Sequence, residues 1–569
     1  MTDSLASKKR PASAPAARAS GERIGPGWTA FEIVWIFLIF CLMAMSPTPD
    51  AGESAYLVKA KHYWDQAWCA GDLFLESADT HLGFYWTFGW LTRYSSLDAA
   101  TWMLRFVAWG LLAWAWQRLS AAIVPRPLFS LLSAGLMLLF AHQMHWAREV
   151  ILRGGVEGKT FAYVAVLLAL GEIVRTKWSL ALLLAGVAGM FHVLVGGWCA
   201  IAIGLAWLAA GSERPRLRSL IPGIVGGLMF ASLGLVPTLA LILGPQPANA
   251  AEAARTYVFD RLAHHLVFHR FGTWYHVRHA VLLAAWGAAF WLTRKEPGLF
   301  RLQLVVGGTV LIALVGIVLD QALVIRANLL GQSLEEYQLA AAPWLKFYWF
   351  RVEDVLVPIG VALAATLGIS RVQVRRPELG NWLLIGAMLA AAANVVDSIY
   401  WRNRLGVPGA VIQQQPTADT RLTWWWESAP ETLTAREWQA AWRNVCQWIG
   451  ENTPPEARFL TPRNQQTFKW HAGRTEVATR KDIPQDAASI LAWRAALDEL
   501  YPNDMPHRRH DLAEFSDEQL IALARKYDCQ YIVIDQSRAG RRIGLPQVYP
   551  IVREDNRLFA VYRVPLAGR

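Results

Sequence analysis

The chain has 569 residues, of which 54% are hydrophobic, and its mean hydropathy is +0.24. This value excludes both a pure membrane bundle and an ordinary soluble enzyme, and it indicates a membrane part joined to a polar part. The formal net charge of +11 arises from basic residues at the ends of apolar runs, which is typical of membrane topology, so we expect no nucleic-acid partner.

Residues 1–27 are rich in Ala, Pro, Ser and basic residues and contain nothing that could form a core. This composition predicts a disordered cytoplasmic tail. The alternative is a cleaved signal peptide made of the tail and the apolar run 31–45. The length of that run and the many apolar runs that follow favour the tail.

Mostly apolar runs of roughly 15 to 25 residues, a length that matches the hydrocarbon core of a bilayer, recur through residues 28–400. We therefore predict an α-helical polytopic membrane domain. Segment 178–210 could instead be a single kinked span. The predicted spans number eleven and cover 28–46, 98–117, 128–146, 159–174, 178–193, 194–210, 219–243, 279–293, 302–321, 352–370 and 381–400.

The short connections between these spans predict their orientation. Five of them carry basic residues and lie on the same side as the basic tail, which makes that side cytoplasmic. The longer connections 47–97, 147–158, 244–278 and 322–351 would then be extracytoplasmic, as would residues 401–569. This predicts a multi-pass protein of the bacterial inner membrane with a large first outer loop at 47–97.

Several ionisable residues lie inside the predicted spans, towards their outer ends. Charged groups in a bilayer are costly and commonly line a water-filled cavity. An outward-facing cavity would account for the whole set, whereas some of its members could simply be interfacial. These residues are Arg105, His142, His192, Asp320 and Asp397.

The first outer loop presents two acids directly after the first span, Asp50 and Glu53 in "PDAGES". The following stretch "YLVKAKHYW" predicts an amphipathic helix along the membrane interface, and Asp79 lies further along the loop. Two carboxylates from one loop could place a general base and a second acid around an acceptor hydroxyl. An acid-bearing loop that is merely solvated is the alternative.

The second and fourth outer loops supply candidate phosphate-binding residues. In "HWAREVILRGGVEGKTFAYV", Arg153, Glu157 and Lys159 surround glycines that would let a ligand approach the backbone. A Gly-rich turn with self-neutralising charges explains the same pattern. In "APWLKFYWFRVEDVLVP", Lys346 and Arg351 could contact a lipid phosphate or act as interfacial anchors.

The sequence assigns no metal-ligating residues. His265 and His269 in the third outer loop have helical i, i+4 spacing, but no paired-acid signature accompanies them, so interfacial histidines are the better interpretation. The five cysteines form no CxxC or related spacing.

Residues 401–569 alternate helical and strand patterns, which predicts a small extracytoplasmic α/β domain. One helix would bury Trp438, Trp442, Val445 and Ile449, and another would begin at a cap near Ser516. The segment "CQYIVIDQS" predicts a buried strand, and "QVYPIVREDNRLFAVYRV" a hairpin that turns near residues 555–556.

This order of features resembles the glycosyltransferase C (GT-C) superfamily, which includes protein O-mannosyltransferases, aminoarabinose transferases and oligosaccharyltransferases. One span leads to an outer loop with acids at the membrane exit and amphipathic helices. Many spans then lead to an extracytoplasmic C-terminal domain. The acid pair of that superfamily is usually a compact DE, ED or ExD, whereas here Ala51 and Gly52 separate Asp50 from Glu53. Which of the two is the base stays open.

The resemblance implies an inverting transferase that moves a sugar from a polyprenyl-phosphate-linked donor to a glycan, lipid or protein acceptor in the cell envelope. The favoured base is Glu53, which begins the amphipathic segment, with Asp50 second, and Asp79 is a further acid from the far part of the loop. Basic residues or a divalent cation would hold the leaving phosphate. The implied phosphate-binding residues are Arg153, Lys159 and Arg351, and the cavity residues are Arg105, Glu157 and His192.

Two other functions compete with the transferase. A transporter or flippase of lipid-linked sugar should show inverted repeats and broken helices, and the sequence contains no internal repeat. A non-catalytic membrane scaffold would not need acids, arginines and histidines from several loops.

Overall fold

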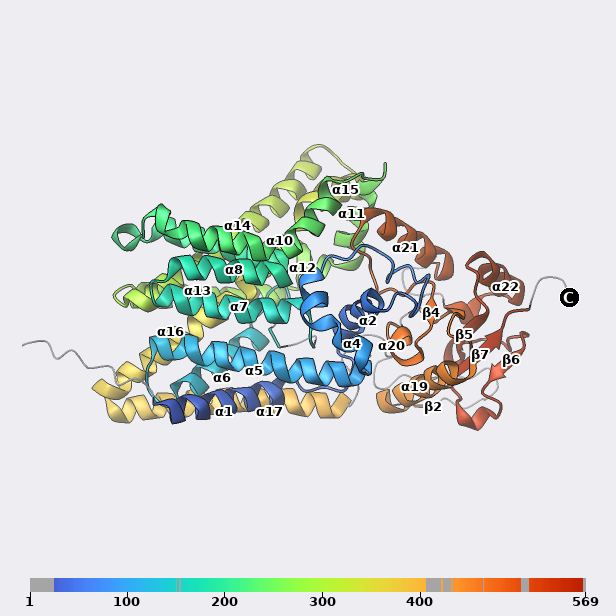
Figure 1. Cartoon of the computed structure of the whole chain (residues 1–569), viewed down its shortest axis with the longest axis horizontal. Coiled ribbons are helices and arrows are strands. Elements are labelled where there is room, and N and C mark those ends of the chain that lie inside the picture. Colours follow the sequence, from blue (N-terminus) through green and yellow to red (C-terminus); the bar gives the residue numbers. More distant parts are fainter. Residues whose placement is uncertain are drawn as a thin grey trace, which may run out of the picture.

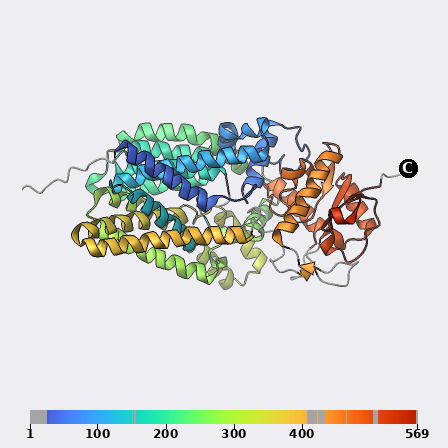
Figure 2. The ribbon, with the colours of Figure 1, turned by 90° about the horizontal axis from the view of Figure 1, so that it is seen from below.

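The computed structural model describes residues 25–149, 151–152, 155–405, 421–422, 431–432, 434–463, 465–502 and 511–565. Two parts lie side by side along the long axis of the molecule, a large helical part and a smaller domain that contains a sheet (Figures 1 and 2). This confirms the mostly helical class with a small C-terminal sheet domain.

Each of the eleven predicted spans coincides with a described helix. These helices are α1 (Pro26–Ala44), α5 (Leu97–Ile123), α6 (Phe129–Gln143), α7 (Gly158–Val174), α8 (Trp178–Phe191), α9 (Val193–Ala209), α10 (Ile221–Leu243), α13 (Thr273–Thr293), α14 (Pro297–Leu329), α16 (Glu353–Arg375) and α17 (Pro377–Leu405). Shorter helices lie in the predicted loops: α2 (Glu53–Trp64), α3 (Leu82–Phe84), η1 (Tyr85–Gly89), α4 (Leu91–Tyr94), α11 (Ala250–Arg255), η4 (Thr256–Arg261), α12 (Ala263–Leu266) and α15 (Leu334–Leu345).

Five of the described helices are long and apolar enough to cross a membrane. They cover Pro26–Ala44, Leu217–Leu243, Pro297–Leu329, Glu353–Arg375 and Pro377–Arg402. Helices α6, α8 and α9 are apolar but shorter. The length and apolar composition of these helices therefore indicate a membrane protein.

The segment 178–210 is two helices and not one kinked helix. Helix α8 ends at Phe191, His192 is extended, and α9 begins at Val193. The chain folds back so closely that a Cβ on Gly196 would lie 2.1 Å from the backbone nitrogen of Gly189. Only glycine permits this contact between the two helices, so the kinked-span alternative is wrong.

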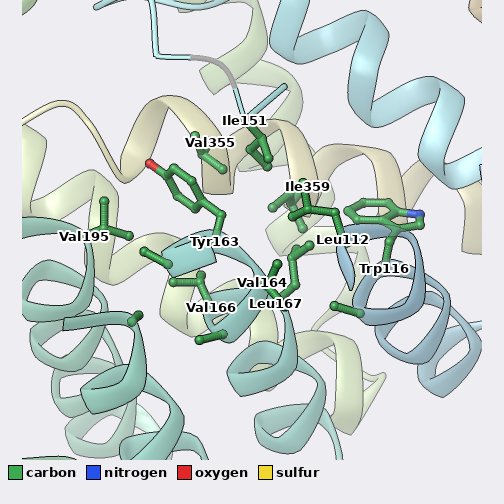
Figure 3. Close-up of a cluster of buried hydrophobic side chains, with 14 of the residues drawn as sticks. Leu112, Trp116, Ile151, Tyr163, Val164, Val166, Leu167, Val195, Val355 and Ile359 are labelled. Atoms are coloured by element: carbon green, nitrogen blue, oxygen red, sulfur yellow. The ribbon is translucent and has the colours of Figure 1, made fainter. Parts of the chain in front are cut away.

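The core of the helical part forms around α7, which is buried along most of its length. Figure 3 shows aliphatic side chains of α7 packed with Leu112 and Trp116 of α5 and with Val355 and Ile359 of α16. Tyr163 lies in the same layer, and its hydroxyl points away from the aliphatic groups. That hydroxyl donates to the carbonyl oxygen of Arg351 (3.3 Å), so the core is anchored to the segment that leads into α16.

The amphipathic helix predicted in the first loop exists as α2, but its polar side is also buried. Lys59 is 5% exposed, and its ammonium donates to the carbonyl oxygens of Phe74 (2.9 Å) and Ser77 (2.7 Å). His62 is buried as well and pairs with the carbonyl oxygen of Trp68. The rest of the loop folds over α2, so this helix is covered by protein instead of lying along an open interface.

The C-terminal domain contains a five-stranded mixed sheet in the order β4-β3-β5-β7-β6. The central strands β3 (Arg458–Leu460) and β5 (Tyr531–Asp535) are parallel, and β5 pairs antiparallel with β7. Its other elements are α19 (Ala435–Asn452), α20 (Phe468–Ala472), β4 (Thr475–Glu476), α21 (Ala487–Leu500), α22 (Asp517–Lys526), β6 (Gln547–Tyr549) and β7 (Phe559–Arg563). A separate pair joins β1 (Arg421–Leu422) and β2 (Glu431–Thr432).

The sequence patterns of this domain are confirmed in most details. The stripe Trp438, Trp442, Val445 and Ile449 is buried, and Ser516 forms a capping box with Gln519 at the start of α22. The predicted hairpin is antiparallel, but β6 ends at Tyr549 and β7 begins at Phe559. Its connection is therefore a longer loop and not a tight turn.

A buried ionic network attaches this domain to the first outer loop. The ammonium of Lys469 lies 2.7 Å from Glu476, 2.9 Å from Asp482 and 3.4 Å from Asp72 of the loop. All four side chains are at most 2% exposed. We call these residues the interdomain network, because Asp72 comes from the helical part and the others from the C-terminal domain.

Two further bonds follow the same boundary. Asp486 accepts from the backbone N–H of Ala78 (3.1 Å), and Arg494 of α21 pairs with Asp260 of η4 (3.1 Å). The C-terminal domain therefore contacts two separate segments of the helical part, the loop 47–97 and η4.

Candidate functional site

Glu53 and Arg105 form a buried ion pair at the exit of α1. Nε and Nη2 of Arg105 each donate to one carboxylate oxygen of Glu53 at 2.7 Å, and both side chains are fully buried. The carboxylate also accepts the backbone N–H groups of Asp50 (2.6 Å) and Val156 (3.0 Å). Four donors therefore hold Glu53, which ties the first outer loop to the second loop and to α5.

The close packing of the two loops explains their glycines. Gly155 has φ +80°, which favours glycine, and a Cβ there would lie 2.3 Å from the Glu53 carboxyl. A Cβ on Gly52 would lie 1.9 Å from Oε1 of Glu157. The glycines of "PDAGES" and of the second loop thus let the predicted acids Glu53 and Glu157 lie against neighbouring backbone.

Asp50 is the more accessible acid of the predicted pair. Its side chain is half-buried, and each oxygen accepts one hydrogen bond, from Ser46 Oγ (3.2 Å) and from the backbone of Ala51 (2.6 Å). No basic side chain pairs with Asp50 among the described residues. Its carboxylate retains lone pairs that could accept a proton.

Four charged residues from two segments and a histidine from a third meet beside these acids. Lys159 lies 3.3 Å from Glu157 and 3.6 Å from Glu149, and Glu149 lies 3.4 Å from Arg351. Nη1 of Arg351 donates to Nε2 of His192 (2.7 Å), which requires a neutral imidazole ring. We call Asp50, Glu149, Glu157, Lys159, His192 and Arg351 the polar cluster.

Aromatic side chains cover one side of the polar cluster. The rings of Tyr56 and His81 are 4.6 Å apart, those of His81 and His192 are 6.0 Å apart, and Tyr348 stacks on Arg351 at 3.8 Å. Burial lowers the pKa of His81 to about 4, and nearby cations act in the same direction. His81 is therefore neutral at pH 7.

The C-terminal domain contributes a lysine that faces the same region. Nζ of Lys481 is buried and has no hydrogen-bond partner among the residues that the structure describes. Burial lowers its pKa to about 8, Arg261 acts in the same direction, and the carboxylates of Asp50 and Glu157 oppose the change. Arg261, at the end of η4, likewise has a buried Nε with no partner in the described part of the chain.

Other predicted site residues lie elsewhere. Asp79 faces Lys59 of α2 (3.7 Å), and Arg153 lies outside the described residues. Asp320 pairs with His269 (3.0 Å), and His265 bonds to the carbonyl oxygen of Ala147. The two histidines with helical spacing therefore point to different partners.

Two features of the region did not emerge from the sequence patterns. Lys481 lies far from the outer loops in sequence, and no local motif links the two. The second feature is the approach of a histidine from another helix to the adjacent acids Glu353 and Asp354 of "FRVEDV". They begin α16 and meet His279 of α13, with one ligand atom of each residue within 4.8 Å of the others.

Comparison with known proteins identifies one segment. Residues 440–500 match a family model described as a domain of unknown function (DUF6798). A search of curated proteins finds no match to the chain. The matched segment contains Lys469, Glu476, Lys481 and Asp482, so the residues through which the C-terminal domain meets the helical part belong to the unit that the model describes.

Proposed function

We propose that the protein is a multi-pass GT-C-like membrane glycosyltransferase with about eleven crossings and a cytoplasmic N-terminus. It transfers a sugar from a polyprenyl-phosphate-linked donor to an acceptor on the extracytoplasmic face of the bacterial inner membrane. The observation that carries the proposal is the polar cluster, since acids, cations and a histidine from four separate chain segments converge there beside the acid pair. Such convergence is costly in a helical membrane part and commonly marks function.

The two acids of "PDAGES" take different roles in this proposal. Glu53 is saturated by four donors, so it positions the loops. Asp50 is the base, because its carboxylate is half-buried and no described cation pairs with it. It removes the proton of the acceptor hydroxyl, the acceptor oxygen attacks the anomeric carbon, and the bond from that carbon to the phosphate oxygen breaks.

The leaving phosphate takes up the electron pair of that bond, and its charge needs cations. Lys159 and Arg351 already share two glutamates, whereas Lys481 has a buried ammonium with no partner among the described residues. A phosphate beside Lys481 would balance the charge of its ammonium. In this arrangement the C-terminal domain completes the phosphate site with Lys481.

The test is a transfer assay on the full chain in membrane vesicles. The donors are polyprenyl-phosphate mannose and polyprenyl-phosphate aminoarabinose labelled with 32P, and the signal is release of polyprenyl phosphate. We expect release by the parent and a fall of about 10² to 10⁴ in Asp50→Asn, as for loss of a general base. Glu76→Gln, which alters an exposed acid of the same loop, is the matched control and should release product as the parent does.

Two outcomes would contradict the proposal. If Asp50→Asn releases polyprenyl phosphate at the parental rate, Asp50 is not the base. Movement of intact donor between leaflets with no release would mark a transporter of lipid-linked sugar.

A further inference from the structure

A second polar group lies deeper in the helical part, beneath the second outer loop. His279 of α13 and the first two residues of α16, Glu353 and Asp354, are all at most 1% exposed. One ligand atom of each residue lies within 4.8 Å of the other two. We call these three residues the His279 cluster.

The histidine is oriented for ligation. Nδ1 of His279 bonds to the carbonyl oxygen of Met144 (2.8 Å), and Nε2 lies 2.8 Å from Oε1 of Glu353. The indole of Trp146 stacks on the ring at 4.4 Å and 14°. A bond from one ring nitrogen to a backbone carbonyl oxygen is how metal-binding histidines are commonly oriented, and it leaves Nε2 as the nitrogen that would bind an ion in place of its bond to Glu353.

The aspartate is equally well positioned. Oδ1 of Asp354 accepts the backbone N–H of Trp146, and Oδ2 accepts those of Ala147 (2.8 Å) and Glu149 (3.1 Å). Each carboxylate oxygen has two lone pairs, so these bonds leave acceptor capacity for an ion.

One carboxylate oxygen of Glu353, Oε2, is buried without a hydrogen-bond partner among the described residues. An unsatisfied carboxylate oxygen in a protein interior costs on the order of 1 to 3 kcal/mol or more, so such atoms are rare. Oε2 belongs to the carboxylate whose other oxygen, Oε1, lies 2.8 Å from Nε2 of His279.

The charges of the cluster point to a divalent ion. Both ring nitrogens of His279 face acceptor oxygens, and His279 is the only basic side chain within ion-pair distance of either acid in the described part of the chain. Glu149, next to Asp354, is itself paired with Lys159 and Arg351. One imidazolium leaves one of the two carboxylate charges uncompensated, whereas a divalent cation that replaces the proton on Nε2 would bring the buried charge of the cluster to zero.

We propose that His279, Glu353 and Asp354 bind a divalent transition-metal ion, with Zn²⁺ the expected metal. One imidazole and two carboxylates form a three-ligand set that Zn²⁺ accepts with a water as fourth ligand. Tetrahedral bonds of about 2.0 to 2.1 Å place donor atoms roughly 3.3 Å apart, so the cluster needs only small shifts to close on an ion. The site is separate from the acid pair, and the inference does not depend on transferase activity.

The ion would stabilise the boundary between the helices and the second outer loop. Asp354 bonds to three backbone N–H groups of that loop, and Glu149 of the same loop belongs to the polar cluster. Metal loading at His279 would therefore stiffen the segment that positions Glu149 and Lys159.

The experiment measures metal content in the full chain, purified in detergent with an affinity tag that contains no histidine. We expect about one equivalent of zinc per parent chain and less than about a tenth in His279→Gln, because removing one of three ligands abolishes tight binding. His276→Gln is the matched control. His276 also contacts Trp146, through Nε1 of the indole (2.8 Å), but lies outside the cluster, so this variant should keep its zinc.

A second measurement needs no variant and therefore does not depend on folding of His279→Gln. X-ray absorption at the zinc edge of the parent should fit nitrogen and oxygen ligands with a single imidazole. Chelation should lower the midpoint of thermal unfolding, and Zn²⁺ but not Mg²⁺ should restore it. A parent with no bound metal and no response to Zn²⁺, zinc retained in His279→Gln, or a spectrum with sulfur or several imidazoles would overturn the inference.

Discussion

The buried pair Glu53–Arg105 and the two cations Lys481 and Arg261 lie in neighbouring parts of the molecule but differ in how their charges are compensated. Arg105 meets its carboxylate with two hydrogen bonds, and two backbone N–H groups complete the site. Lys481 has a buried ammonium, and Arg261 a buried Nε, with no hydrogen-bond partner among the described residues. The Glu53–Arg105 pair therefore has the properties of a structural element. Lys481 and Arg261 have the properties of an anion-binding site.

The largest effect should follow from breaking the Glu53–Arg105 pair. Arg105→Met leaves the Glu53 carboxylate buried without a cation, which should cost about 3 to 5 kcal/mol of stability. The double variant Arg105→Met, Glu53→Met removes both charges and should recover much of that loss. Urea unfolding in detergent, followed by tryptophan fluorescence, measures both.

If Arg105→Met loses less than about 1 kcal/mol of stability, the Glu53–Arg105 pair is no stronger than an exposed surface pair. That result would contradict its structural role.

The interdomain network sharpens the comparison, because there one ammonium serves three carboxylates. Lys469→Met should cost about 2 to 3 kcal/mol, less than Arg105→Met, because a carboxylate of the network can take up a proton instead. We expect faster proteolytic release of the C-terminal domain and a lower midpoint of unfolding. Lys526→Met, which removes an exposed pair with Glu499, is the control, and an equal effect of both variants would contradict a role for the network.

The same network predicts a pH dependence whose sign is fixed by Glu476. Burial raises its pKa to about 7 from 4.5, while Lys469 opposes the shift and Asp482 and Asp72 add to it. The folded state therefore keeps a proton that the unfolded state has lost. The contribution to stability is full below pH 4.5 and is lost as the pH rises through 7.

We expect this loss to be on the order of 1 to 2 kcal/mol, because burial also raises the pKa of Asp482, which shares the proton. Glu476→Gln should remove this part of the pH dependence when unfolding is measured between pH 4.5 and 7.5. A parent and variant with the same slope would show that Glu476 does not carry the proton.

The smallest effect on stability should come from replacing Lys481. Lys481→Met removes a buried ammonium that has no hydrogen-bond partner in the described part of the chain, so stability should change by no more than about 0.5 kcal/mol or rise slightly. The same urea titration measures it. A loss comparable with that of Arg105→Met would mean that Lys481 is structural, which would remove the main argument for an anion beside it.

Much of the fold could be predicted because its signals are local. Apolar length located the helices, and alternating patterns located the strands of the C-terminal domain. The fold of the first outer loop could not be read in this way. The segment "YLVKAKHYW" has an amphipathic pattern, yet Lys59 is buried because loop carbonyl oxygens replace water around its ammonium.

The candidate site was predictable to a similar extent. Glu157, Lys159, His192 and Arg351 were found by residue type and position relative to the spans, and the structure places them in contact. The pairing of Arg105 with Glu53, the separation of Asp79 from that pair and the approach of Lys481 are long-range contacts. They depend on how loops distant in sequence pack, which no local spacing records.

The most direct test of the central claim is binding of polyprenyl phosphate to the full chain in detergent, measured by native mass spectrometry with neutral polyprenol as the comparison. We predict that the phosphate binds more tightly than polyprenol and that Lys481→Met weakens it about tenfold, as for one charge-assisted hydrogen bond. Because the pKa of Lys481 is about 8, parent binding should weaken as the pH rises from 7 to 9, whereas Lys481→Arg should keep its affinity. Equal binding of phosphate and polyprenol, or an unchanged affinity in Lys481→Met, would contradict the account.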